Sequence, residues 1–520
     1  MPVELVIGAL SVADLCLKYG KKLLQLYRDV KGAHKDLEDK ILQVESIWRK
    51  TSVQIGVMKK VNRKIDDEQR RIQEDLMERL WESLASIVRK LESHCDSQSD
   101  RLQQIRFAVA KDSIERALHE LEKWHKLYDP TWFLITLMSD TLLDTELQTI
   151  RNDTDTKSVS ALAQLRSILH GQKPAQDLHV TLNSAQFDLA KAVPIKYNDI
   201  KIYSRTSISS GTTQTCIIDS IPCKEHTNVP SVRADAENLA RTLKTVDPET
   251  FGLLRCQGLV KTKSEKTQKL EAMHLVFLVQ ASLCTSLHEQ LLTRPATTIS
   301  LTRRLEIAKS LANSVAFVHV CNLVHKNIRP ESIICFSDQS VFLLGFDGFR
   351  TVHYQTLRMG DNSLERNLYQ HPTRQGMRAQ ENYVMQHDIY SLGVCMVEVG
   401  LWASLLGYED EDDGGDIAAP HKVTPAEILG DFADYDLGNW PENTRFGIKN
   451  RLLELARSRL PCCMGERYAA ATVACLTCLD DDTNEFEGLA EGTGVKDENG
   501  VVVGVRFIEK ILLGLNQIAV

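Results

Sequence analysis

Two short stretches in the second half of the chain gather polar residues of the types that transfer protons and hold metal ions. They read Val324-His325-Lys326-Asn327-Ile328-Arg329-Pro330-Glu331-Ser332 and Leu343-Leu344-Gly345-Phe346-Asp347. Several of their residues are poorly suited to that chemistry. The neutral amide of Asn327 cannot act as a base, the hydroxyl of Ser332 is a poor metal ligand, and Gly345 has no side chain to offer a metal.

The two stretches resemble the catalytic loop and the D-F-G motif of protein kinases. In that family an Asp accepts the substrate hydroxyl proton, while an Asn and a second Asp hold magnesium over the phosphates. The resemblance places Asn327, Ser332 and Gly345 at these positions. Shifting the alignment by one residue, to Phe346-Asp347-Gly348, would restore a metal-binding carboxylate at Asp347 but not the base. The resemblance therefore implies a degenerate kinase without a metal site, and argues against an enzyme.

Further segments in the second half extend the resemblance. The run His387-Asp388-Ile389-Tyr390-Ser391-Leu392-Gly393-Val394 resembles the kinase segment D-x-Y-S-x-G-V, whose Asp ties the catalytic loop to a buried helix. Asp388 is that residue here. The run Tyr369-Gln370-His371-Pro372-Thr373 stands where kinases carry A-P-E, with Thr373 in place of the Glu. In the family the His of the catalytic loop is structural, so the resemblance implies the same for His325.

The part of a kinase that binds nucleotide is poorly represented. Residues 200–203 and 215–218 predict two strands joined by a turn around Gly211, but no G-x-G-x-x-G pattern occurs there. The position of the kinase strand-three lysine falls within Cys216–Pro222, which contains no lysine. Lys224 and Glu237 are weak candidates for that lysine and its acidic partner. No cofactor is implied with certainty, and ATP binding without turnover is an open alternative.

Length and composition set broad limits. A chain of 520 residues is too long for one core and predicts two or three domains. The formal charge of -8 argues against nucleic acid as a partner. The 13 cysteines show no paired spacing typical of zinc sites, and they favour a reducing, cytoplasmic location. The apolar start, Met1–Leu10, carries Glu4 where a signal peptide has a positive charge, and it is too short to span a bilayer.

The first third of the chain reads as helix throughout. Apolar residues recur at helical spacing in three runs up to Asp129-Pro130, which interrupts the pattern. Members of these runs are Leu37, Ile41, Val44, Trp48 and Ile55; Ile72, Leu76, Leu80, Leu84, Ile87 and Leu91; and Leu102, Ile105, Val109, Leu118, Leu121, Trp124 and Tyr128. Such faces predict an α-helical bundle.

The opening of this bundle, residues 3–15 followed by 18–23, resembles that of HeLo-type bundles in fungal proteins that end in divergent kinase-like domains. The ending at residues 504–512 resembles the same proteins. The predicted fold is therefore α plus α/β: a HeLo-like bundle over residues 1–180, a kinase-like N-lobe over 190–283 and a kinase-like C-lobe over 284–520. This architecture is similar to that of the mixed-lineage kinase domain-like pseudokinase.

The resemblance implies a regulated cell-death effector of the heterokaryon-incompatibility, prion-propagation type. In such proteins the activated, oligomeric bundle enters the plasma membrane. An apolar stripe and a set of cations in the first helix would suit an anionic membrane, the stripe being Val3, Val6, Ile7, Leu10 and Ala13 and the cations Lys18, Lys21, Lys22 and Arg28. The stripe would equally suit packing in a core.

Partners implied by this interpretation are further copies of the chain, an anionic membrane surface and an upstream sensor protein that the sequence does not identify. Two alternatives stay open: a divergent ATP-binding serine/threonine kinase with a helical targeting domain, and a non-catalytic scaffold.

Overall fold

The structure is a computed structural model of the chain. It describes residues 11–30, 35–62, 65, 67–93, 111–125, 128, 132, 179–206, 213–223, 229–246, 248–264, 266–279, 283–351, 363–376, 379–409, 422–432, 441–480 and 501–518. By its internal contacts the chain divides into two compact units, Met1–Arg166 and Ser167–Val520. The finer domain limits predicted from the sequence, at residues 180, 190 and 283, stay predictions.

The described residues of the N-terminal unit are almost all helical, as predicted. The unit contains α1 (Val12–Val30), α2 (Lys35–Val61), α3 (Asp67–Glu92) and the helical residues 111–125. The predicted faces are buried on α2 and α3, as Ile41, Val44, Trp48, Ile72, Leu76 and Leu84 illustrate. Gly20 lets α1 and α2 approach closely, because a Cβ there would overlap the Trp48 ring. Within the described residues, no helix is long and apolar enough to cross a membrane.

Buried polar contacts fix the register of these helices. The Tyr27 hydroxyl donates to the carbonyl oxygen of Ser113 over 3.0 Å, and the Trp124 indole N–H donates to the carbonyl oxygen of Leu76 over 2.8 Å. Both side chains are almost fully buried, so each polar atom needs the partner it has. Apolar faces and these bonds together specify the packing of the unit.

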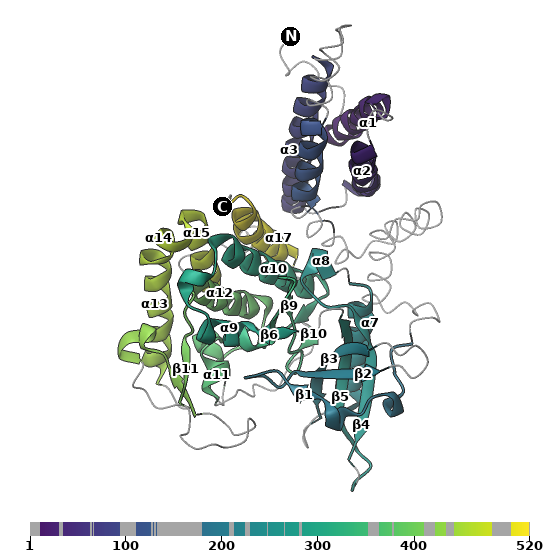
Figure 1. Ribbon diagram of the computed structural model, residues 1–520. Coiled ribbons are helices and arrows are strands. Elements are labelled where there is room, and N and C mark those ends of the chain that lie inside the picture. Colours follow the sequence, from purple (N-terminus) through teal and green to yellow (C-terminus); the bar gives the residue numbers. More distant parts are fainter. Residues whose placement is uncertain are drawn as a thin grey trace. The chain divides into compact units, whose positions relative to one another are not determined.

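The C-terminal unit begins with a five-stranded antiparallel sheet in the order β1-β2-β3-β5-β4 (Figure 1). Its strands are β1 (Val193–Pro194), β2 (Lys201–Thr206), β3 (Thr213–Pro222), β4 (Cys256–Lys263) and β5 (Leu270–Val279). The predicted pairing of two strands around residues 200–218 is confirmed, with Ile202 opposite Ile217. Helix α7 (Val229–Lys244) packs against β4 and β5, and the short α8 (Pro248–Phe251) follows it.

The rest of the unit is mostly helical, and Figure 1 shows it on one side of the sheet. Its larger elements are α9 (Leu287–Thr293), α10 (Leu301–Val320), α12 (Met385–Leu401), α13 (Glu442–Ser458) and α15 (Glu466–Leu476). Helix α12 is central, since every one of its residues except Gln386 is buried.

Shorter elements complete this part of the chain. The strands are β6 (Cys284–Ser286), β7 (Leu323–Val324), β8 (Ile333–Phe336), β9 (Val341–Leu343), β10 (Arg350–Thr351), β11 (Leu406–Glu409) and β12 (Lys422–Pro425). The short helices are η6 (Ala296–Thr298), η7 (Pro330–Ser332), α11 (Leu364–Asn367), η8 (Pro372–Arg374), η9 (Glu427–Phe432), α14 (Leu460–Met464), α17 (Val501–Phe507), the π-helical η10 (Ile508–Leu512) and α18 (Leu513–Asn516). The C-terminal unit thus mixes sheets and helices, as the predicted α/β part requires.

Candidate functional site

The loop between β7 and β8 carries the first of the two polar stretches, and Asp388 of α12 holds it in place. One carboxylate oxygen of Asp388 accepts the backbone N–H of His325 over 2.7 Å, and the other accepts that of Lys326 over 2.9 Å. Tyr383 and His319 also bond to this carboxylate. Burial opposes ionisation, yet the bonds from His319 and the loop outweigh it and lower the pKa of Asp388. The predicted anchoring role of Asp388 is confirmed.

His325 lies fully buried beneath the loop. Its ring packs against Phe346, with 4.7 Å between the ring centroids, and its Nδ1 accepts the backbone N–H of Asn327 over 3.3 Å. Burial lowers the pKa of His325 to about 4, so the ring is neutral near pH 7. These contacts are those of a structural residue.

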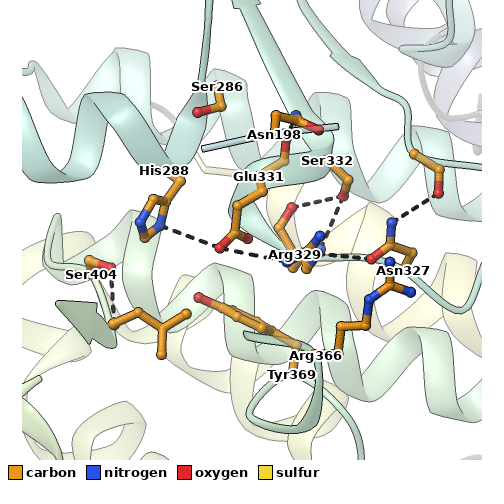
Figure 2. Close-up of polar contacts among 12 residues, drawn as sticks. Asn198, Ser286, His288, Asn327, Arg329, Glu331, Ser332, Arg366, Tyr369 and Ser404 are labelled. Carbon is orange, nitrogen blue, oxygen red and sulfur yellow. Dashed lines mark hydrogen bonds and ion pairs between the residues drawn. The ribbon is translucent and has the colours of Figure 1, made fainter. Parts of the chain in front are cut away.

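Asn327 uses both ends of its amide within the protein. Its Nδ2 donates to the carbonyl oxygen of Gly345 over 3.1 Å and to Oδ1 of Asp347 over 2.9 Å. Its Oδ1 accepts from Nε of Arg329 over 2.9 Å (Figure 2). A carboxylate in its place could not donate to Asp347, so this arrangement depends on an amide.

Ser332 is almost completely buried, and its hydroxyl caps the turn that precedes it. The hydroxyl donates to the carbonyl oxygen of Arg329 over 2.8 Å and accepts the backbone N–H of the same residue over 3.2 Å. Figure 2 shows the Ser332 side chain directed at Arg329. The hydroxyl therefore stabilises η7 rather than pointing toward an open site.

Gly345 follows β9 in a backbone conformation that side chains rarely adopt, with φ of +84°. A Cβ at this position would lie 2.9 Å from Nδ2 of Asn327 and 2.9 Å from Cβ of Ser332. Both the backbone and its neighbours thus require glycine.

Asp347 keeps a carboxylate beside the loop, but both of its oxygens are bonded. Oδ1 accepts from Asn327, and Oδ2 accepts from Nη2 of Arg366 over 2.6 Å. The side chains of Asp347 and Arg366 are 22% and 27% exposed, so this ion pair is largely shielded from water. A metal at Asp347 would have to displace Arg366. No group of three potential metal ligands occurs within the part of the chain that the structure describes.

Asp219 of β3 completes this site, and the sequence did not single it out. Its side chain is 2% exposed, and its Oδ2 accepts the backbone N–H groups of Gly345 and Phe346 over 2.8 and 2.9 Å. Burial, with a contribution from Asp347, raises the pKa of Asp219 to about 7. The sequence signal that could have found it is an Asp directly after the apolar run Cys216-Ile217-Ile218 of β3. We call Asp219, Asn327, Ser332, Gly345 and Asp347 the loop cluster.

A second buried group lies beside the loop cluster. The carboxylate of Glu331 is 1% exposed, and its Oε1 lies 3.8 Å from Nδ1 of His288 and 3.8 Å from Nη1 of Arg329 (Figure 2). The Asn198 amide, in the turn between β1 and β2, donates to the carbonyl oxygen of Glu331. The first turn of the sheet is therefore bonded directly to the loop.

Of the two residues predicted as weak candidates for nucleotide contact, the structure describes only Glu237, and its ion pairs lie outside the loop cluster. Lys224 lies outside the described residues. Glu237 of α7 bonds to Lys261 of β4 over 2.8 Å and to Arg233 of its own helix over 3.0 Å. Partial burial opposes ionisation, but these cations outweigh it and lower the pKa of Glu237. Glu237 thus has a lysine partner on β4, and a role of either residue in nucleotide binding stays a prediction.

Comparison with known proteins gives a limited match. No protein-family model matches the chain. A Raf homolog serine/threonine-protein kinase of Caenorhabditis elegans is 26% identical over 99 residues, which make up 18% of this chain and 12% of that kinase. The chain therefore spans only a small part of that relative. The match indicates a kinase-like region in this chain.

Proposed function

We propose that the C-terminal unit is a bilobal, kinase-like domain that no longer transfers phosphate and instead acts as a switch for the N-terminal helical unit. The main support for this proposal is the loop cluster. An amide stands at the position that resembles that of the kinase catalytic base, and the polar side chains of the cluster bond to one another. Asn327 donates to Asp347, and Asp219 accepts from Gly345. Phosphoryl transfer depends on a positioned base and metal ligands, and these contacts occupy both positions.

The sheet face that carries Asp219 supports the same proposal. Residues 217 and 219 of β3 share a face because strand side chains alternate, and Ile217 pairs with Phe277 of β5. Ile217 and Phe277 are both fully buried. Bulky side chains and a carboxylate where kinases hold nucleotide disfavour an anionic ligand, so we expect the switch to work without ATP turnover.

For the N-terminal unit we propose action at an anionic membrane, as in HeLo-type cell-death effectors that oligomerise when an upstream sensor activates them. The exposed face of α1 supports this. Lys18, Lys21 and Lys22 are exposed, as is Arg28 further along the helix. Each such cation contributes about 1 kcal/mol near an anionic surface. Recruitment from the cytoplasm to the plasma membrane would then follow activation.

Burial of the apolar side of α1 favours either the scaffold alternative or a bundle that is held in an inactive state. Of the stripe predicted to enter a membrane, Val3, Val6, Ile7 and Leu10 lie outside the described residues. Ala13 is buried in the bundle. An effector must therefore release at least this part of α1 before it inserts. The divergent-kinase alternative is supported by the match to the Raf homolog.

Dye release from anionic liposomes tests the proposal. The fragment of residues 1–171, checked for helical structure by circular dichroism, is compared with the full chain. Leakage by the fragment and not by the full chain would support a bundle restrained by the C-terminal unit. A folded fragment that neither binds nor permeabilises the vesicles would exclude the effector, and an ATP-binding assay on the full chain would then separate kinase from scaffold.

A further inference from the structure

The segment Val180–Ala192, which we call the strap, lies along the outer edge of the five-stranded sheet before the chain enters β1. Thr181 forms a parallel bridge with Leu259 of β4. The backbone N–H of Leu182 donates to the carbonyl oxygen of Leu259 over 2.9 Å, and the N–H of Leu259 donates to the carbonyl oxygen of Val180 over 2.6 Å. The strap thus pairs with the strand that would otherwise be the exposed edge.

Beyond this edge the strap crosses one face of the sheet. Phe187 is buried there, and Leu182, Leu189 and Ala192 pack around it. The sheet residues of this core cluster are Tyr203, Cys216, Ile218, Val260 and Val276. The Tyr203 hydroxyl also accepts the backbone N–H of Asp188 over 3.3 Å. Backbone pairing and apolar burial together fix the strap on the sheet.

Gly258 of β4 makes the close approach of the strap possible. A Cβ at this position would overlap the carbonyl oxygen of Val180 and lie 2.8 Å from Cγ of Leu182. The first obstacle is backbone, which cannot rotate away as a flexible side chain would. An alanine at position 258 would therefore push the strap off β4.

Helix α7 packs against the same strand, β4, on the opposite face of the sheet. Val260 points to the strap side, so its neighbour Lys261 points to the other side, where it pairs with Glu237 of α7 over 2.8 Å. At the end of α7, Nζ of Lys244 donates to the carbonyl oxygen of His179 over 3.0 Å. Strand β4 and Lys244 thus connect α7 to the strap.

We propose that the strap is a coupling device: displacement of α7 releases it from β4, and its release frees the chain segment that leads to the N-terminal unit. The strap has 13 residues (180 to 192 inclusive), so its release adds up to roughly 45 Å of extended tether. A switch requires a packed segment that has two alternative arrangements. Here the position of α7 would determine which arrangement the strap adopts. The proposal rests on the switch role given above for the C-terminal unit.

Hydrogen exchange on the full chain tests this inference. Gly258→Ala is compared with Gly514→Ala, a matched control, because a Cβ at Gly514 in α18 meets nothing within 4 Å. We expect at least tenfold faster exchange in the strap and also in α7 for Gly258→Ala, with wild-type exchange in the control. Coupling is reciprocal, so Glu237→Gln, which removes the charge that Lys261 pairs with, should accelerate exchange of the Leu182 amide. Faster strap exchange with unchanged α7 exchange would overturn the inference.

A milder variant serves if Gly258→Ala does not fold. Lys244→Ala removes the bond to His179 at an exposed site, and a rise of a few fold in exchange of both segments is expected. Dye release by the same variants separates this inference from the proposed function. Coupled exchange without leakage would count against the membrane role alone, whereas uncoupled exchange would remove the strap as a device whatever the vesicles show.

Discussion

The loop cluster and the exposed face of α1 use polar side chains in opposite ways. In the loop cluster Asn327 and Asp347 bond to each other and to arginines of the same fold, and Asp219 accepts backbone N–H groups. On α1 the lysines at positions 18 and 21 are exposed, and neither forms an ion pair with the residues that the structure describes.

This difference indicates where interactions with other molecules are to be sought. Groups in a catalytic site must remain available to substrate, cofactor or metal, whereas those of the loop cluster bond to other groups of the same fold. Lys18 and Lys21 of α1 are exposed and contribute little to stability, whereas Lys22 and Arg28 pair with Glu92 and Glu45.

The largest effect is expected for Gly345→Asp, which would introduce the residue type that the D-F-G motif of kinases uses to bind metal. Its Cβ would meet Asn327 and Ser332 at 2.9 Å while the backbone has φ of +84°. We expect a loss of about 3 kcal/mol or more in the unfolding free energy of the C-terminal unit, measured by urea denaturation.

Gly465→Asp is the control for backbone strain. Gly465 has a similar φ of +87°, but a Cβ there meets nothing within 4 Å. Its ψ of 161° places it in a region that is almost restricted to glycine, so this variant should lose about 1–3 kcal/mol from backbone strain alone. Equal losses in the two variants would show that crowding in the loop cluster is unimportant.

Asn327→Asp would introduce the residue type of a catalytic base, and we expect it to destabilise the fold without creating activity. The new carboxylate would stand about 3 Å from Oδ1 of Asp347, in place of a donor now at 2.9 Å. A loss of about 1–3 kcal/mol is expected near pH 7, smaller at pH 4 where one carboxyl can be protonated. A double-mutant cycle with Asp347→Asn measures the coupling, and additive losses would contradict this contact.

Asp219 gives a pH-dependent prediction. Its pKa is raised from 3.8 to about 7, so the folded chain binds a proton there that the unfolded chain has released. Asp219 makes its full favourable contribution to the unfolding free energy below about pH 4, and this contribution is lost as pH rises through 7. Relative to wild type, Asp219→Asn should therefore gain stability between pH 4 and 7, by up to about 4 kcal/mol at about 1.4 kcal/mol per pKa unit. Parallel stability curves for the two proteins would contradict the raised pKa.

The sequence predicted those features that depend on local pattern. The buried faces of α2 and α3 followed from apolar residues at helical spacing, such as Ile41 and Leu76. The anchoring role of Asp388 followed from a motif whose geometry recurs with its spacing. The residue types at Asn327 and Gly345 predict that kinase chemistry is missing, because an amide and a hydrogen atom cannot replace two carboxylates, and this stays a prediction.

Other features depend on contacts between distant parts of the chain and left little local signal. Asp219 bonds to backbone N–H groups 126 and 127 residues away, and backbone groups carry no sequence signature. Glu237 finds its lysine on β4 because the sheet places Lys261 beneath α7. The strap was missed because its single bridge and short 3₁₀ turns have no periodicity.

We expect the smallest effect on stability for substitutions of the exposed lysines of α1. These substitutions also test most directly whether that face of α1 binds an anionic surface. Replacing Lys18 and Lys21 together by Glu should change the unfolding free energy by less than about 0.5 kcal/mol, because both side chains are exposed. Binding of the fragment 1–171 to anionic vesicles should weaken at least tenfold, since each cation contributes about 1 kcal/mol, and the difference should shrink as salt is added. Arg79→Glu, an exposed reversal on α3, is the control. If Arg79→Glu weakens vesicle binding as much per reversed charge as the double substitution does, the face of α1 is not a specific binding surface. Net charge alone would then account for the affinity.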